Sequence, residues 1–159
     1  MSRRPTATQT NDLRRLLQRL FRRFGALGTD FTPCGRPLSM AHAHALMVLL
    51  AKGELSQQHL GAELCIDKSN VARLCAKMTE AGQVRQRQCA KDARSRRVRL
   101  TARGERLARE VEAASGSRFS TLLTEVPPAR RTQVLEALEV FVTALDALPP
   151  ALPDARNSE

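Results

Sequence analysis

Two short helical segments separated by only three residues constrain this chain more than any other feature. The first is expected over residues 57–64, after Ser56, and the second over residues 68–81, after Asp67. Serine and aspartate are favoured N-cap residues, and Gly82 is a typical stop after a helix. Two helices joined by so short a turn form a helix-turn-helix, in which the second helix is the candidate reader of DNA.

The pattern changes after the second helix. Residues 84–89 show no apolar helical stripe, residues 97–101 alternate polar and apolar side chains, and residues 90–96 form a polar turn between them. Residues 83–103 hold eight basic side chains against one acidic side chain, a ratio that is repulsive without an anionic partner. The sequence therefore predicts a basic β-hairpin next to the helix-turn-helix.

Amphipathic helices flank this region on both sides. One is expected over residues 11–28, where leucine and phenylalanine follow the i, i+3, i+4, i+7 spacing of a helix. Another is expected over residues 40–52, and two more over 104–148, separated by Pro127 and Pro128. We therefore expect a mainly α fold with a small β-hairpin, in the α+β class.

The 159 residues allow one domain with a substantial core rather than two domains. We expect a flexible basic arm over residues 1–10, a single domain over residues 11–148 and a disordered tail over residues 149–159. The tail is rich in proline, which cannot continue a helix.

The second helix of the helix-turn-helix presents two different sides. With 3.6 residues per turn, Val71, Cys75 and Met78 fall together and are expected to pack inward. Arg73 falls on the opposite side, with Asn70 toward its edge. Arginine suits guanine and asparagine suits adenine, so this side is suited to reading base edges.

Candidate DNA contacts come from both halves of the motif. Arg94 at the hairpin tip is suited to a narrow minor groove, and Asp92 is placed to orient it by a charge-assisted hydrogen bond. The lysines of the second helix and the strand arginines are suited to phosphates, although each arginine taken alone could be a solvated surface charge. The full set is Ser56, Gln57, Lys68, Ser69, Asn70, Arg73, Lys77, Arg85, Arg87, Asp92, Arg94, Arg96 and Arg97.

Charge and composition narrow the class of partner. The net charge of +10 is concentrated in residues 1–24 and 67–103, which carry +6 and +8, while the rest is slightly acidic. A basic block on a strand–turn–strand favours DNA over a membrane surface, and 3% aromatic residues disfavour a stacking platform for single strands. No stretch reaches the roughly 20 apolar residues of a membrane span, and no secretory signal is evident, so we expect a cytoplasmic protein.

Motifs of catalysis and metal binding are missing from the sequence. No HExxH, GxSxG, Walker or GxGxxG pattern is present, so we expect neither an enzyme nor a cofactor. The four cysteines lack the close pairs of a zinc site, so no metal is expected. Cys65 and Cys75 are expected to be buried, whereas Cys34 and Cys89 are candidates for a redox switch, because basic neighbours favour the Cys89 thiolate.

Taken together, these motifs resemble the MarR family of winged helix-turn-helix regulators. The resemblance lies in residues 55–64, 67–74, 81–85 and 92–104. Its most specific part is the D-x-R of Asp92 and Arg94, followed by a strand and an L-T-x-x-G run. Order and spacing together carry the resemblance, which no single piece would do.

The resemblance implies a winged helix-turn-helix over about residues 39–103 and a homodimer, with dimerisation helices over about 11–28 and 104–148. It also implies binding to a palindromic double-stranded operator and repression that a small aromatic or anionic ligand, or an oxidant, relieves. His42 and His44 would border the ligand crevice, although residues two apart point to different sides of a helix. Ordinary partly buried histidines are the alternative for this pair, and a non-specific architectural DNA-binding protein is the alternative for the chain.

Overall fold

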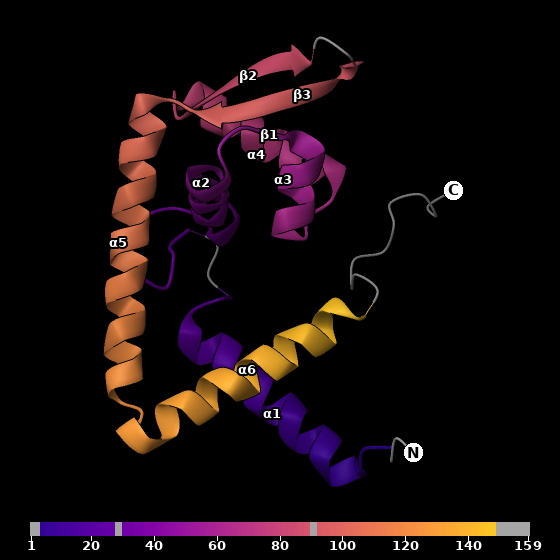
Figure 1. The fold of residues 1–159 in the computed structure, drawn as a ribbon, viewed down its shortest axis with the longest axis vertical. Helices are drawn as coiled ribbons and strands as arrows, with labels where there is room; N and C mark the ends of the chain where they lie inside the picture. The colour runs from indigo at the N-terminus through magenta and orange to yellow at the C-terminus, as the bar shows by residue number, and fades with distance from the viewer. Residues whose placement is uncertain (1–3, 28–29, 90–91, 149–159) are drawn as a thin grey trace. The chain divides into compact units, whose positions relative to one another are not determined.

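The computed structural model describes residues 4–27, 30–89 and 92–148, except for the side chains of Cys89 and of residues 92–94. Its elements are α1 (Ala7–Phe24), α2 (Met40–Lys52), β1 (Leu55–Ser56), α3 (Gln57–Leu64), α4 (Lys68–Glu80), β2 (Val84–Cys89), β3 (Asp92–Leu100), α5 (Ala102–Thr124), the 3-10 turn η1 (Pro128–Arg130) and α6 (Arg131–Asp146) (Figure 1). This architecture confirms the predicted mainly α fold with a small sheet. The chain divides into two compact units, Met1–Met40 and Ala41–Glu159.

In the first unit, α1 begins earlier than the sequence predicted. The Thr6 hydroxyl accepts a hydrogen bond from the Gln9 backbone N–H at 3.2 Å, and the Gln9 side chain accepts one from the Thr6 backbone N–H at 2.9 Å. This capping box starts the helix ahead of its apolar stripe, so residues 7–10 are helical and do not belong to a flexible arm. The helix ends at Phe24, because Gly25 adopts the left-handed conformation with φ 78°.

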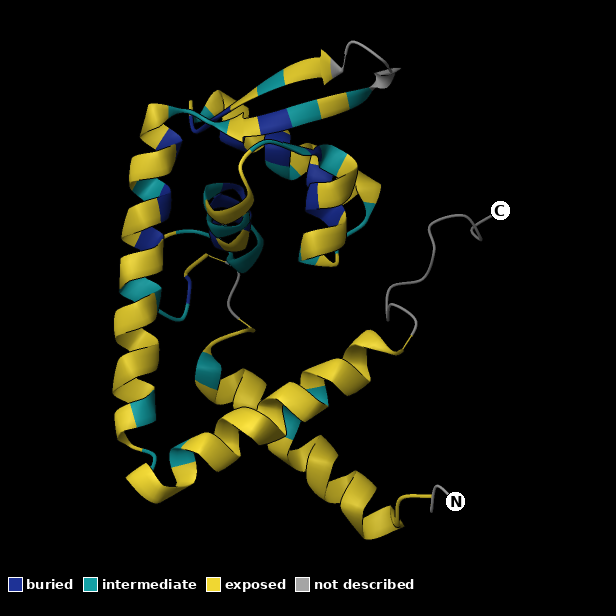
Figure 2. Cartoon of the chain, viewed as in Figure 1, coloured by how far each residue is buried: buried dark blue, intermediate teal, exposed yellow. Residues whose placement is uncertain are grey.

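In the second unit, the core lies among α2, α3, α4, α5 and the sheet (Figure 2). Its buried apolar residues are Ala43, Ala45, Leu46, Leu49, Leu60, Val71, Cys75, Met78, Val84, Val98, Ala108 and Val111. Burying such side chains is the main favourable contribution to folding. By contrast, α6 contributes no buried residue. No helix in the described parts of the chain is long and apolar enough to cross a membrane.

The sheet is antiparallel, with strand order β1-β3-β2. Val84 pairs with Leu100 at the base of the β2–β3 hairpin. The hairpin is longer than predicted, because β3 begins at Asp92 within the segment 90–96 that the sequence suggested as a turn. Residues 92–96 lack the alternation of large apolar and polar residues that indicated a strand over residues 97–101.

A short joint connects the end of α4, the start of β2 and the start of α5. The Thr101 hydroxyl accepts a hydrogen bond from the Gly104 N–H at 3.1 Å. It also donates toward two carbonyl oxygens, that of Gly82 at 2.7 Å and that of Gln83 at 3.2 Å. The Thr101 N–H donates to the same Gln83 carbonyl at 2.9 Å. Gly104 packs against that carbonyl so closely that a Cβ would lie 1.9 Å from its oxygen. The L-T-x-x-G run therefore encodes this joint.

The two C-terminal helices differ from the prediction at their ends. α5 continues without a break across Gly116. Arg131 closes the turn after α5, since its Nε donates to the carbonyls of Leu123 and Val126, each at 3.1 Å. α6 begins at Arg131, after the 3-10 turn that starts with Pro128, and not at the proline pair itself.

We predict that Gly104→Ala destabilises the protein by about 1–3 kcal/mol, because the added Cβ collides with the Gln83 carbonyl. Gly116→Ala is the matched control on the same helix, where a Cβ would meet nothing within 4 Å. Alanine is the better helix former, so this control should raise stability by about 0.5–1 kcal/mol. Urea denaturation measures both, and equal stabilities would contradict the close approach.

Candidate nucleic-acid interface

α3 and α4 are joined by a three-residue turn, as predicted. Cys65 follows α3 in the left-handed conformation, with φ 52°, and its N–H donates to the Ala62 carbonyl at 3.1 Å. Gly61 allows the close contact of the two helices, because a Cβ there would lie 3.3 Å from the Ile66 carbonyl oxygen and 3.4 Å from Val71. Cys65 is exposed, because this turn lies at the surface, so the prediction of a buried Cys65 is wrong.

α4 buries one side and exposes the other, as its period predicted. Val71, Cys75 and Met78 are at most 2% exposed. Burial raises the pKa of the Cys75 thiol to about 11, which keeps the thiol protonated and unreactive. The exposed residues of α4 include Lys68, Ser69, Asn70, Arg73 and Lys77. The helix therefore offers solvent the side chains that the sequence suggested for reading DNA.

A chain of hydrogen bonds orders the exposed side of α4. Asp67 caps the helix by accepting from the Asn70 N–H at 2.8 Å, and its carboxylate also accepts from the Asn70 side-chain amide. The Asn70 side-chain oxygen in turn accepts from Arg73 Nη2 at 2.6 Å. The hydrogen bond from the Asn70 backbone is the first cause that lowers the pKa of Asp67. Arg73 is thus held in one orientation before any partner arrives.

A second set of hydrogen bonds fixes the hairpin to the helix-turn-helix. Gln57 Nε2 donates to Gln86 Oε1 at 2.5 Å, and Gln86 Nε2 donates to the Thr79 hydroxyl at 2.8 Å. Ser56 is buried, and its hydroxyl caps α3 by accepting from the His59 N–H at 3.1 Å. Ser56 and Gln57 therefore hold the scaffold together in the free protein, and their contacts with DNA stay predictions.

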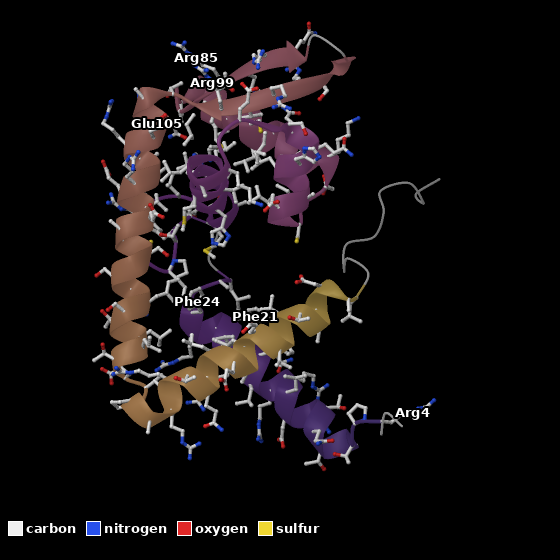
Figure 3. All side chains as sticks on the ribbon, viewed as in Figure 1. Arg4, Phe21, Phe24, Arg85, Arg99 and Glu105 are labelled. Carbon is white, nitrogen blue, oxygen red and sulfur yellow. The ribbon has the colours of Figure 1, made fainter. Side chains whose placement is uncertain are left out.

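The strand register separates the hairpin arginines onto two faces. Arg85 lies opposite Arg99, and Figure 3 shows this pair at the end of the sheet next to α5. Arg87 lies opposite Arg97, two residues along, so these four side chains share one face. Arg96 is displaced by one residue from Arg97 and lies on the other face. The sequence alternation suggested such a division but not which arginine lies where.

Glu54, a residue that the sequence analysis missed, binds two of these arginines. Its carboxylate accepts from Arg87 Nη2 at 2.8 Å, from Arg87 Nε at 3.1 Å and from Arg97 Nε at 3.0 Å. These hydrogen bonds, from Arg87 first and then Arg97, lower the pKa of Glu54 to about 2. Nothing local in the sequence signals this contact, because Glu54 is separated from Arg87 by 33 positions.

A cavity of about 520 Å³ opens between the helix-turn-helix and the hairpin. Lys68 from α4 and Arg96 from β3 line it, together with the polar side chains of Gln57, Gln58 and Ser95. The remaining lining residues are Gly61, Ile66 and Val71. The cavity therefore brings two predicted phosphate contacts, from distant parts of the chain, to one place with polar walls.

The two candidate ligand histidines have different surroundings. His42 is 4% exposed, and its Nε2 lies 2.6 Å from Gln83 Oε1. Burial, the largest cause, lowers the pKa of His42 and favours the neutral ring. His44 is exposed. The structure does not bring the two together, and the surroundings of His42 match those of a hydrogen-bonded core histidine.

The redox role of Cys34 and Cys89 and the wing-tip contacts of Asp92 and Arg94 stay predictions. Cys34 is half-buried, with its Sγ 2.9 Å from the Thr32 hydroxyl. The side chains of Cys89, Asp92 and Arg94 lie outside the described residues. Among the residues that are described, no group of three or more His, Cys, Asp or Glu side chains is arranged to hold a metal ion.

The fold and this surface have counterparts in known proteins. Residues 37–95 match the model of the MarR family. A MarR transcriptional regulator from Methanosarcina mazei Go1 is similar to it, with 25% sequence identity over 87% of this chain and 99% of the other, and a TM-score of 0.70.

Two further solved structures share this fold. BpsR of Bordetella bronchiseptica is 19% identical over 82% of this chain and 98% of its own, with a TM-score of 0.69. The PcaV transcriptional regulator of Streptomyces coelicolor is 19% identical over 91% of this chain and 99% of its own, with a TM-score of 0.67. No match was found among curated protein sequences.

We predict that the Glu54 ion pairs stabilise the fold above the ordinary carboxyl pKa of 4.5 and that this contribution is lost as pH falls toward about 2. The sign follows from the lowered folded-state pKa: the unfolded chain binds the proton first, so acid favours unfolding. Urea denaturation of the wild type and Glu54→Gln should show a stability difference at about pH 7 that shrinks on acidification. A difference independent of pH would contradict this assignment.

Proposed function

We propose that the protein is a homodimeric regulator that binds a palindromic double-stranded operator, represses transcription and is released by a small aromatic acid. The observation that carries the proposal is the exposed side of α4. Asp67 holds Asn70 and Asn70 holds Arg73, so the donor groups are oriented before DNA binds. Preorganised donors lose less conformational freedom on binding, which favours base reading by α4.

The composition of the exposed side of α4 supports sequence-specific binding over non-specific binding to the DNA backbone. A protein that only neutralises phosphates needs lysine and arginine, whereas α4 exposes Ser69 and Asn70 beside Arg73. Lys68 and Lys77 lie on the same helix and are suited to the flanking phosphates. Arg94 at the hairpin tip would add a minor-groove contact.

Exposed apolar side chains support a dimer. In α6, Leu135, Leu138 and Leu145 are 55%, 49% and 50% exposed. In α1, within the other unit, Leu16 and Phe21 are 60% and 50% exposed. Apolar surface gathered on one side of a helix marks an interaction site. We assign both helices to contacts with a second copy, which would place two α4 helices about one DNA turn, roughly 34 Å, apart.

Release by a ligand is proposed from the relatives. DNA binding by BpsR is regulated by 6-hydroxynicotinic acid, an aromatic acid. We propose that a ligand of this class acts here. His42 is already bonded to Gln83, which leaves the exposed His44 as the candidate contact. Oxidation of Cys34 or Cys89 is the alternative trigger, and release by peroxide from a variant with serine at both positions would exclude these two thiols.

The test is selection of duplexes from a random DNA pool at near-physiological salt. An enriched inverted repeat with half-sites about one helical turn apart supports the proposal. Binding without an enriched motif would identify an architectural protein instead, and absence of binding would reject both. The selected operator then allows aromatic acids and oxidants to be screened for release.

We predict that Arg73→Ala weakens operator binding by about 1–3 kcal/mol and relaxes the base preference at one position of each half-site, because one base contact is lost. Arg109→Ala removes the same charge from an exposed position of α5 and should change affinity no more than roughly threefold. Fluorescence anisotropy on the operator and on single-base variants measures this. Equal losses on the operator and on random DNA would show that Arg73 contacts only phosphate.

We predict that Leu138→Asp shifts the protein from dimer to monomer, because it places a charge in the middle of the apolar side of α6. Thr132→Asp adds the same charge away from the centre of that side, near the start of the helix where acid is tolerated, and should remain dimeric. Sedimentation equilibrium distinguishes the two states. A dimeric Leu138→Asp variant would remove α6 from the interface.

A further inference from the structure

The β2–β3 hairpin carries arginine side chains on both of its faces. Arg87 and Arg97 lie directly opposite each other on neighbouring strands, a position in which like charges are destabilising. Arg96 lies on the other face of the same hairpin. Among the residues that the structure describes, only one of the two faces forms ion pairs with an acidic side chain from elsewhere in the chain.

That partner is Glu54, which follows Gly53 at the end of α2. Gly53 has φ 74°, a conformation that favours glycine, and it directs the chain from α2 toward β1. The Glu54 side chain is 20% exposed and reaches both arginines with donor–acceptor distances of 2.8–3.1 Å. The contact with Arg87 is two-pronged, which is the strongest geometry for a guanidinium and a carboxylate.

The opposite face has different surroundings. Arg96 and Lys68 line the same cavity beside the N-terminus of α4. Within the described parts of the chain, no ion pair involves either of them. This face therefore presents two cations to an incoming phosphate, whereas the Glu54 face presents two cations that are already neutralised.

We propose that Glu54 is a specificity-determining residue, which holds Arg87 and Arg97 away from DNA and leaves the phosphate contacts of this part of the hairpin to Arg96 beside Lys68. The inference rests on the proposed DNA-binding function and deepens it. Arginine–phosphate contacts form on DNA of any sequence. Preventing one of them therefore lowers the affinity for non-specific DNA more than it lowers the preference for the operator over other sequences. Glu54 thereby raises the ratio of specific to non-specific binding.

The test compares the full-length protein with three variants on the selected operator and on a random duplex, at several salt concentrations. Glu54→Gln keeps the shape and removes the charge. The double variant Arg87→Gln/Arg97→Gln removes the two arginines that Glu54 holds, and Lys68→Gln/Arg96→Gln is matched to it in charge. Fluorescence anisotropy gives the dissociation constants and the slope of log K against log salt, which a purely structural role would not change.

Three results are expected. Glu54→Gln binds random duplex about two- to tenfold more tightly and steepens the salt slope by up to about 1.8, since each new phosphate contact adds roughly 0.9. Arg87→Gln/Arg97→Gln keeps the wild-type slope. Lys68→Gln/Arg96→Gln has a salt slope that is shallower by about 1.8. Thermal unfolding confirms that each variant is folded. If Arg87→Gln/Arg97→Gln fails to fold, the single variant Arg87→Gln replaces it, because Glu54 then remains paired with Arg97.

Two outcomes would overturn the inference alone. In the first, Arg87→Gln/Arg97→Gln lowers the salt slope as much as Lys68→Gln/Arg96→Gln does. That result would show that the arginines bound by Glu54 contact phosphate. The other is a folded Glu54→Gln whose affinity for random duplex equals that of the wild type. A wild-type protein that binds no duplex would instead reject the proposed function, and this inference with it.

Discussion

The backbone carbonyl of Gln83 is the point on which the rest of the second unit depends. Thr101 donates to it from its main chain and its side chain, and Gly104 packs directly against it. The Gln83 side chain reaches in another direction to His42 of α2. The end of α4, the start of the hairpin and the first turn of α5 therefore share one fixed position. Hydrogen bonds and close packing thus join α5 to the end of α4 and to the start of β2 at this position.

Electrostatics then sets what the hairpin offers to a partner. Cross-strand arginine pairs are unfavourable unless a carboxylate or an external anion offsets them. Glu54 offsets the pair of Arg87 and Arg97, and the next pair, Arg85 and Arg99, has no such carboxylate among the described residues. A single acidic side chain from outside residues 67–103 thus offsets part of the positive charge of that segment.

The sequence predicted elements whose signals are local. α2, α3 and α4 were predicted within a residue of their bounds, because their caps and apolar spacing lie within the helices themselves. The inward and outward sides of α4 followed from the same period. Contacts between distant segments were not predictable: Glu54 with Arg87, Gln57 with Gln86 and His42 with Gln83. These pairs show that Gln57 and His42, two of the candidate site residues, also hold distant segments of the scaffold together.

The hydrogen-bonded chain from Asp67 through Asn70 to Arg73 has a consequence for how substitutions within it combine. Each member is fixed by its neighbour, so replacing one residue alters the geometry of the others. The effects of substitutions at these three positions on binding are therefore expected to be non-additive, so the contribution of each residue depends on the identity of the other two.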